Sequence, residues 1–277
     1  MAIDVASRMS TKSASRTQGR RRVRLPSSRV AQIVVVVAVL VAWQLFATIG
    51  DLGAVPTPVA VGAAAITAVV EGSLWGPLGA TLASWGVSLI LAVVVGVAVG
   101  FPLGASRIAY RMSVFTLDFL RTIPALVLVP LVVLLYGSGL ESTILLAFFA
   151  AVWAVIMQTI YGAHDVDKVA RDTFRSFRIR RGDTLLFLLV PTALPYIATG
   201  IRLAAAICLL VTISAQIVIP AGGLGESILT SQLGGDIPTM YAYIVFCGLL
   251  GVGVNAGFAR MEKALLSWHP AHRTVVA

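Results

Sequence analysis

Apolar runs about twenty residues long fill almost all of the chain after residue 30, and they limit the possible folds more than any other feature. The first run, from Val30 to Ile49, contains no charged residue. As an α-helix it would be about 30 Å long, which matches the hydrocarbon core of a bilayer and exceeds the core of a signal peptide. We therefore predict a retained transmembrane helix here and five more at about 81–103, 114–136, 142–162, 195–219 and 240–260. The predicted fold class is an all-α membrane protein with six transmembrane helices.

The distribution of basic residues predicts the orientation of these helices. The connecting segments 50–80, 137–141 and 220–239 contain acidic residues but neither Lys nor Arg. The segments 1–29, 104–113, 163–184 and 261–277 contain nearly all of the 21 basic residues. Basic residues are retained on the cytoplasmic side of membrane proteins. We therefore predict that both termini are cytoplasmic, and the net charge of +9 does not indicate nucleic-acid binding.

The chain is predicted to form one membrane domain with two polar tails. Residues 1–29 carry eight basic residues among many Ser and Thr, which predicts a disordered cytoplasmic tail. The composition of this segment also resembles a transit peptide. The transmembrane domain is expected over 30–265, with a cytoplasmic segment at 163–184, and residues 266–277 form a C-terminal tail.

Small residues at four-residue spacing indicate that the helices pack as a bundle. Gly96, Gly100 and Gly104 share one face of the second span, and Gly253 and Gly257 repeat this spacing in the sixth. Such spacing lets helix backbones approach closely in lipid, although Gly is also simply frequent in membrane helices.

The sequence lacks the motifs of an enzyme or a metalloprotein. No Gly-Lys pair is present, so the phosphate-binding loop of a nucleotide hydrolase is absent. Three His and two Cys occur without the spacing of a metal site. Asp118 and Arg121 have the spacing of an i,i+3 ion pair on a helix. We expect no catalytic residue, no metal and no cofactor bound by this chain.

The cytoplasmic segment 163–184 is the most informative part of the sequence. On a helical wheel Val166, Ala170, Phe174 and Phe177 form one face, and a separate face is formed by Lys168, Arg171, Arg175 and Arg178. Such a helix could lie on anionic lipid headgroups through its basic face. It could equally insert its aromatic residues into a groove on a soluble partner. The pattern alone leaves both interpretations open.

Several prolines are predicted to bend the helices. Pro191 and Pro195 precede the fifth span, and Pro124 and Pro130 lie in the third. Each lacks an amide donor and restricts the residue before it. We expect kinks at Pro124, Pro130 and Pro195.

The order of these stretches resembles the permeases of ABC importers, in particular the nitrate, sulfonate and taurine group. That family has a cytoplasmic Glu-Ala-Ala-x-x-x-Gly motif followed by Leu-Pro, to which the stretch from Asp165 to Ile197 aligns without gaps. The resemblance places Asp172, Thr173 and Phe174 on the first three motif positions and Pro191 on a motif proline. Further resembling stretches are Val55-Pro-Thr-Pro58, Leu120-Arg-Thr-Ile-Pro-Ala125 with Pro130, Gly200-Ile-Arg-Leu203 and Gly222-Gly-Leu-Gly225.

One departure from the family motif stands out. Arg178 occupies the position of the motif glycine, although Arg lacks the access of glycine to positive φ. Gly182, four residues later, could supply a displaced turn. The basic segment from Arg175 to Arg181 suggests a dedicated ATPase with an acidic complement, although the motif could also have drifted.

The resemblance implies a type I ABC importer permease in a bacterial inner membrane. It implies a second permease copy in a homodimer, two cytosolic ATPase subunits that bind ATP and Mg²⁺, and an extracytoplasmic solute-binding protein. The residues that it implies for coupling to the ATPase are Asp172, Thr173, Phe174, Arg175, Phe177, Arg178, Gly182 and Pro191. Phe174 and Phe177 are expected to be the anchors in the ATPase groove. The implied substrate is a small organic anion or oxyanion.

Four polar residues within the spans are candidates for the translocation pathway. Arg121 and Arg202 are costly in an apolar environment unless they are paired or hydrated. Both lie near the cytoplasmic ends of their spans, so ion pairing or snorkelling is an alternative. Ser214 and Gln216 could line the pathway or form hydrogen bonds between helices.

Two other classes of protein compete with the importer permease. An ATP-independent transporter would need pore-lining charges or inverted repeats, and neither is evident in the sequence. A membrane-anchored scaffold or signalling protein would explain the basic tail but not the proline-rich spans.

Overall fold

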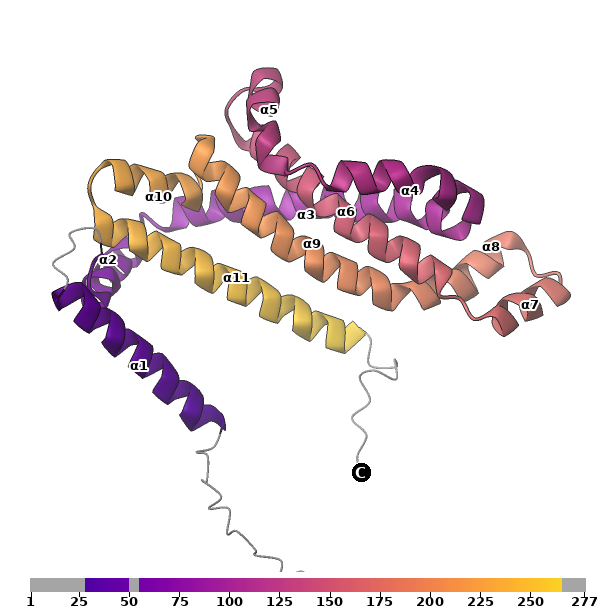
Figure 1. Cartoon of the computed structure of the whole chain (residues 1–277), viewed down its shortest axis with the longest axis horizontal. Coiled ribbons are helices and arrows are strands. Elements are labelled where there is room, and N and C mark those ends of the chain that lie inside the picture. The colour runs from indigo at the N-terminus through magenta and orange to yellow at the C-terminus, as the bar shows by residue number, and fades with distance from the viewer. Residues whose placement is uncertain (1–27, 50–54, 266–277) are drawn as a thin grey trace, which may run out of the picture.

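The computed structural model describes residues 28–49 and 55–265, and every regular element in these ranges is helical (Figure 1). The C-terminal tail and nearly all of the basic N-terminal tail lie outside the described residues. The elements are α1 (Ser28–Ile49), α2 (Pro58–Val70), α3 (Trp75–Ala105), α4 (Arg107–Arg121), η1 (Ala125–Leu128), α5 (Val129–Tyr136), α6 (Leu140–His164), α7 (Lys168–Ser176), α8 (Arg181–Thr184), the π-helical turn η2 (Leu185–Leu189), α9 (Val190–Val218), α10 (Leu224–Leu233) and α11 (Ile237–Leu265).

Five of the described helices are long and apolar enough to span a membrane by themselves. They are α1, α3, α6, the continuous helical stretch that contains α9, and α11, as the hydropathy pattern predicts. A sixth span exists if α4 and the helical segment from Ala125 to Tyr136 are counted together. The all-α membrane fold expected from the sequence is therefore confirmed, with one span that is broken.

The third span is not the single helix predicted over 114–136. Its two helical parts meet at an angle of 75°. Pro124 itself has an extended backbone (φ −65°, ψ 122°), and its ring also disfavours a helical conformation for the residue before it. Pro130 does not bend the chain, since it lies in the first turn of α5, where its missing N–H leaves no bond unmade. The kink expected at Pro124 is thus a full break, and the one expected at Pro130 is absent.

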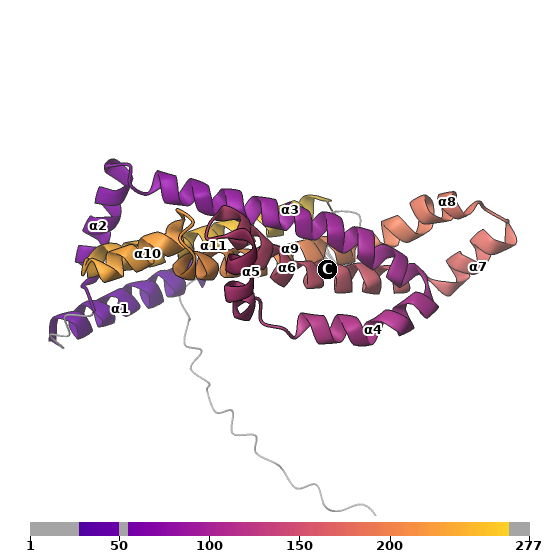
Figure 2. The same ribbon diagram turned by 90° about the horizontal axis from the view of Figure 1, so that it is seen from above.

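The core of the bundle is formed by α3, α6 and α9, which run side by side (Figures 1 and 2). Added Cβ atoms at Gly96 and Gly104 would lie 2.6 and 2.7 Å from Cβ atoms of α6, and one at Gly100 would lie 2.8 Å from the Ile156 carbonyl oxygen. This confirms the close α3–α6 approach that the glycine spacing predicts. Gly253 and Gly257 have no such neighbour, so the same spacing in α11 serves no contact within the described part of the chain.

The loop before α10 packs closely on α9 through the Gly222-Gly-Leu-Gly225 stretch. Gly222 has φ +73°, a value that favours glycine. The backbone at Gly223 packs on the amide of Gln216, and that at Gly225 packs on the Ile213 carbonyl. Thr81 completes the junction, since its hydroxyl donates to Gln216 Oε1 and accepts from the Leu224 N–H, each at 2.9 Å.

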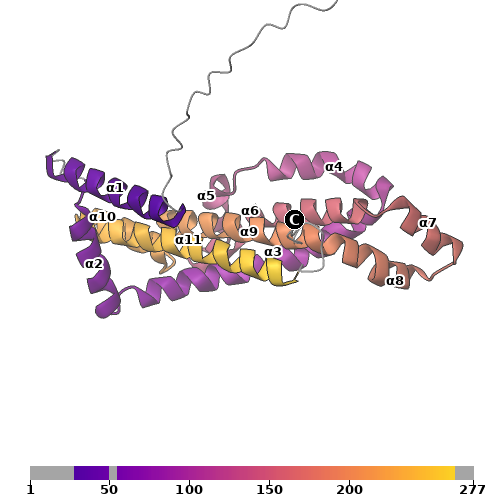
Figure 3. The same ribbon diagram turned by 90° about the horizontal axis from the view of Figure 1, so that it is seen from below.

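The segment 163–184 and the turn between α3 and α4 lie at the same end of the bundle. Figure 3 shows α7 and α8 beyond the ends of α6 and α9, with α2 and α10 at the opposite end. The short helices at the two ends therefore flank the long spans.

Candidate functional site

The segment between α6 and α9 forms a short helix with defined caps rather than one helix over 163–184. The Asp167 carboxylate accepts a hydrogen bond of 2.9 Å from the Ala170 N–H, which caps the N-terminus of α7. The helix ends at Ser176, and α8 starts at Arg181. The segment therefore consists of two short helices joined by a turn, at the end of the bundle.

The C-terminus of α7 is a Schellman motif in which Arg178 takes the position usual for glycine. The Ile179 N–H donates to the Phe174 carbonyl at 3.1 Å, and the Arg178 N–H donates to the Arg175 carbonyl at 3.0 Å. Arg178 has φ +52° and is the only described non-glycine residue with positive φ. The turn has thus not moved to Gly182, which lies in α8 without a positive φ, and that expectation is wrong.

The two aromatic residues of this segment point to different surroundings. Phe177 is 76% exposed, and Val169, on the same side of α7, is 74% exposed. Phe174 is half-buried and lines a hollow together with Ile179 and Leu189. Phe174 thus faces a hollow of its own chain, whereas Phe177 projects outward, and the expectation that both are anchors in the ATPase groove stays a prediction.

The remaining residues expected to act in coupling lie on several sides of α7. The Thr173 hydroxyl donates to the Val169 carbonyl at 2.8 Å. Asp172 and Arg175 are exposed, 4.0 Å apart, and both line a cavity between α7 and the α3–α4 turn. Val169, Thr173 and Phe177 are exposed, and we call the side of α7 that they form its outer face.

The segment 163–184 is joined to the bundle through Asp165 and the start of α9. The Tyr196 hydroxyl donates to Asp165 Oδ2 at 2.6 Å. Upstream, the π-helical turn η2 leads directly into α9. Pro191 occupies the first turn of α9, and Pro195 lies inside the helix, which continues to Val218. The kink expected at Pro195 therefore does not interrupt α9.

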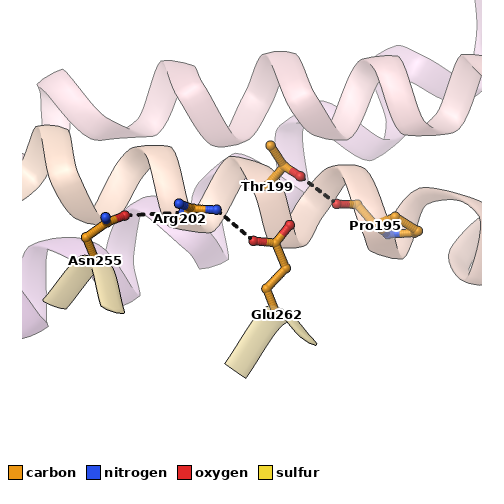
Figure 4. A network of polar contacts seen from close by, with 5 residues as sticks. All are labelled: Pro195, Thr199, Arg202, Asn255 and Glu262. Atoms are coloured by element: carbon orange, nitrogen blue, oxygen red, sulfur yellow. Dashed lines mark hydrogen bonds and ion pairs between the residues drawn. The ribbon is translucent and has the colours of Figure 1, made fainter. Parts of the chain in front are cut away.

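A cavity of about 320 Å³ opens between α9 and α11. Its apolar lining includes Leu209, Ile213 and Phe258, and its polar lining includes Arg202, Ser214 and Asn255. Figure 4 shows Arg202 between the two helices, donating to Asn255 Oδ1 and Glu262 Oε2, each at 3.3 Å. The ion pair with Glu262 holds the charge of Arg202 beside a mainly apolar cavity.

The other pathway candidates occupy different environments. Arg121 pairs with Asp118 at 3.0 Å on half-exposed α4, as their spacing predicts, and does not line the α9–α11 cavity. Gln216 is 1% exposed and holds the junction with Thr81. Of the four candidates, Arg202 and Ser214 line the cavity, whereas Gln216 forms the interhelical hydrogen bond that was its alternative role.

Three residues of the site have contacts that sequence reasoning did not foresee. Glu262 and Asn255 reach Arg202 from α11, more than fifty residues away in the chain, and Tyr196 reaches Asp165 across 31 residues. Their only signal in the sequence is that polar residues at the ends of apolar helices tend to need partners.

A bundle of membrane-spanning helices with a capped amphipathic helix at one end and a cavity between two spans has the architecture of a transport subunit. Residues 92–266 match the family model described as binding-protein-dependent transport system inner membrane component. The chain belongs to this family and is a permease component of an ABC transporter.

Three named permease proteins align with most of the chain. It is 27% identical over 250 residues to the nitrate import permease protein NrtB of Synechocystis, covering 87% of this chain and 90% of the relative. It is 26% identical over 200 residues to the taurine transport system permease protein TauC of Escherichia coli, covering 72% and 73%. It is also 26% identical over 238 residues to a putative aliphatic sulfonates transport permease protein of Bacillus subtilis, covering 85% and 86%.

Solved structures support the fold. A chain of the methionine ABC transporter MetNI in an inward-facing conformation aligns with a TM-score of 0.60 at 20% identity, covering 67% of this chain and 92% of that one. A chain of an amino acid ABC transporter aligns with a TM-score of 0.58 at 13% identity, covering 72% and 96%.

Proposed function

We propose that two copies of this chain form the translocation pathway of an ABC importer in a bacterial inner membrane. Two cytosolic ATPase subunits bind ATP and Mg²⁺ and drive transport, and an extracytoplasmic solute-binding protein delivers the substrate. The chain itself binds no cofactor. The family and the three named relatives support this proposal.

In this proposal α7 is the contact with the ATPase. The observation that carries it is the outer face of α7, where Val169 and Phe177 are exposed at the end of the molecule. A soluble partner with an apolar groove would bury both side chains, and one aromatic residue often contributes much of the binding energy of such a contact. Asp165 and Tyr196 then transmit the movement of α7 to α9.

The topology in this proposal puts α7 and both termini in the cytoplasm. The segment 163–184 is rich in Arg and Lys, whereas 220–239 at the opposite end has none. Residues 1–29 and 266–277 form cytoplasmic tails of a membrane domain at 30–265.

The α9–α11 cavity supports a small anion as substrate. Arg202, which is paired with Glu262, supplies cationic hydrogen-bond donors to the cavity, and the apolar part of the lining suits a short carbon chain. The designations of the relatives name nitrate, taurine and aliphatic sulfonates. We infer that the substrate is a small organic anion such as a sulfonate, or an oxyanion.

The exposed basic residues next to Phe177 favour a dedicated ATPase. Arg178 and Arg180 are exposed and follow Phe177 in the chain, so an acidic rim on the partner groove would steer docking. If a generic ATPase of the same transporter group restored full uptake, this part of the proposal would be wrong.

The deciding experiment measures ATP hydrolysis in proteoliposomes that contain the permease, its candidate ATPase and the binding protein. Phe177→Ala is expected to abolish ATPase association and stimulation by loaded binding protein while leaving the unfolding temperature unchanged. Phe174→Ala is the matched control, since it shortens a side chain of the same type that packs on its own chain. It is expected to lower stability by about 1–2 kcal/mol and to retain ATPase binding. If the ATPase binds neither the wild type nor the control, a scaffold or an ATP-independent transporter becomes the better interpretation.

A further inference from the structure

A basic cavity lies on the opposite side of α7 from its outer face, at the end of the bundle where α3 turns into α4 and α6 ends. Its volume is about 500 Å³. Its lining consists of the cations Arg107, Lys168, Arg171 and Arg175, together with Ala105, His164, Val166 and Asp172. Three of the four cations come from α7, and the fold brings Arg107 of α4 to them.

The cavity has more positive charge than the surrounding carboxylates neutralise. Its lining has four cations and one carboxylate, that of Asp172, which gives a net charge of +3. Asp172 is 4.0 Å from Arg175. Asp165 and Asp167 are next to the lining residues in the chain and keep their negative charge, so the cavity and its surroundings together retain a net charge of +1, from four cations and three carboxylates. An anion inside the cavity would relieve the repulsion between these cations.

The chemistry of the cations suits a phosphate group. Three of the four are Arg, whose planar guanidinium presents paired donors that match phosphate oxygens. Lys168 adds a compact positive charge at the start of α7. Both a free phosphate and a lipid headgroup carry this group.

The surface next to the cavity distinguishes the two sources. Ile108, Met112 and Phe115 follow Arg107 along one face of α4, at i, i+4 and i+7, and all three are exposed. A free anion would use only the cavity, whereas a phospholipid would also cover this apolar face with its acyl chains. Basic pockets at the cytoplasmic ends of transmembrane helices are suited to anionic headgroups.

We propose that the basic cavity binds the phosphate headgroup of an anionic phospholipid whose acyl chains lie along Ile108, Met112 and Phe115 of α4. This site is separate from the outer face of α7 and does not depend on the identity of the ATPase or the transported solute. It assigns Arg107, Lys168 and Arg171 to lipid binding.

The test uses the purified full-length chain and native mass spectrometry to measure retained phosphatidylglycerol, with phosphatidylcholine as the neutral reference. Arg107→Gln/Arg171→Gln is expected to weaken phosphatidylglycerol binding by about thirtyfold, given the contribution of each basic residue near anionic lipid. The matched control is Arg260→Gln/Lys263→Gln, which removes the same charge from exposed positions on α11 and is expected to change binding less than about twofold. Unfolding temperatures verify that both variants fold.

Two further measurements distinguish a bound phospholipid from free phosphate. Ile108→Gln/Met112→Gln is expected to weaken phosphatidylglycerol binding with every cation retained. Inorganic phosphate at millimolar concentration is expected not to displace the lipid. Equal losses in the cavity variant and the α11 control would overturn the proposal, as would displacement by inorganic phosphate together with an unchanged affinity of the α4 variant.

Discussion

Tyr196 on α9 donates a hydrogen bond of 2.6 Å to Asp165, which lies in the linker between α6 and α7. The bond joins the second turn of α9 to the segment that carries the outer face of α7. Since Tyr196 immediately follows Pro195, it lies where α9 has lost one backbone hydrogen bond.

Removal of this hydrogen bond should uncouple ATP hydrolysis from substrate transport. Tyr196→Phe is expected to lower stability by no more than about 1 kcal/mol, because the pair is exposed. Substrate uptake should fall more than ATP hydrolysis, since α7 can still bind the ATPase but no longer moves α9 with it. A double-mutant cycle with Asp165→Ala checks the assignment, and independent effects of the two substitutions on uptake would contradict it.

Arg178→Gly should stabilise the end of α7. An L side chain in the left-handed region costs roughly 1 kcal/mol, and glycine removes that cost. Thermal unfolding of the purified chain is expected to show this gain, while Arg180→Gly, two residues later and without a positive φ, should show none. If Arg178 also steers ATPase docking, the stabilised variant associates with the ATPase more slowly, especially at low salt.

Gly100 should tolerate no side chain. A Cβ atom there would lie 2.8 Å from the Ile156 carbonyl oxygen and 2.9 Å from Thr159 Cβ, so Gly100→Val must force α3 and α6 apart. We expect a loss of several kcal/mol or failure to accumulate in the membrane. Gly86→Ala, on the same helix with open space around its Cβ position, is the control and is expected to be neutral.

Gly223 and Gln216 should show strong non-additivity. Gly223→Ala alone places a methyl group about 2 Å from the Gln216 amide and is expected to destabilise the α9–α10 junction by about 1–3 kcal/mol. Gln216→Ala alone loses the hydrogen bond with Thr81. The double variant should lose less stability than the sum of the two, because shortening Gln216 removes the clash. Additive losses in unfolding experiments would show that the clash relaxes in another way.

Arg202 should matter to transport more than to folding. Arg202→Gln is expected to reduce anion uptake by about tenfold or more, since the only basic side chain lining the α9–α11 cavity is lost. Glu262→Gln is the informative partner, because it breaks the ion pair but leaves the cation in place. Uptake that falls equally in both variants would indicate that the pair stabilises the bundle rather than recognising the solute.

Hydropathy predicted most of the fold. Helices such as α6 and α11 appear in the sequence as long apolar runs, and spacing predicted the ion pair between Asp118 and Arg121. A kink was predicted at Pro124, but the full break of the third span was not, because its two halves have the composition of one span and only the backbone at Pro124 separates them.

The candidate site was less predictable because its geometry depends on distant contacts. A helical wheel treats Phe174 and Phe177 as one face, yet α7 ends at Ser176 and the turn directs them to different surroundings. The partners of Arg202 come from α11, 53 and 60 residues later in the chain. No local pattern encodes either outcome.

Because η2 is a π-helical turn, the number of residues between α8 and α9 affects how α8 is oriented relative to α9. A π-helical turn accommodates one residue more than an α-helical turn, and each residue of an α-helix advances the chain by about 100°. Deletion of one residue between Leu185 and Leu189 would let this turn become α-helical and rotate α8 about the axis of α9. The direction in which Phe177 points is thus set partly by residue count, so that homologous permeases with one residue fewer here would present α7 from a different side.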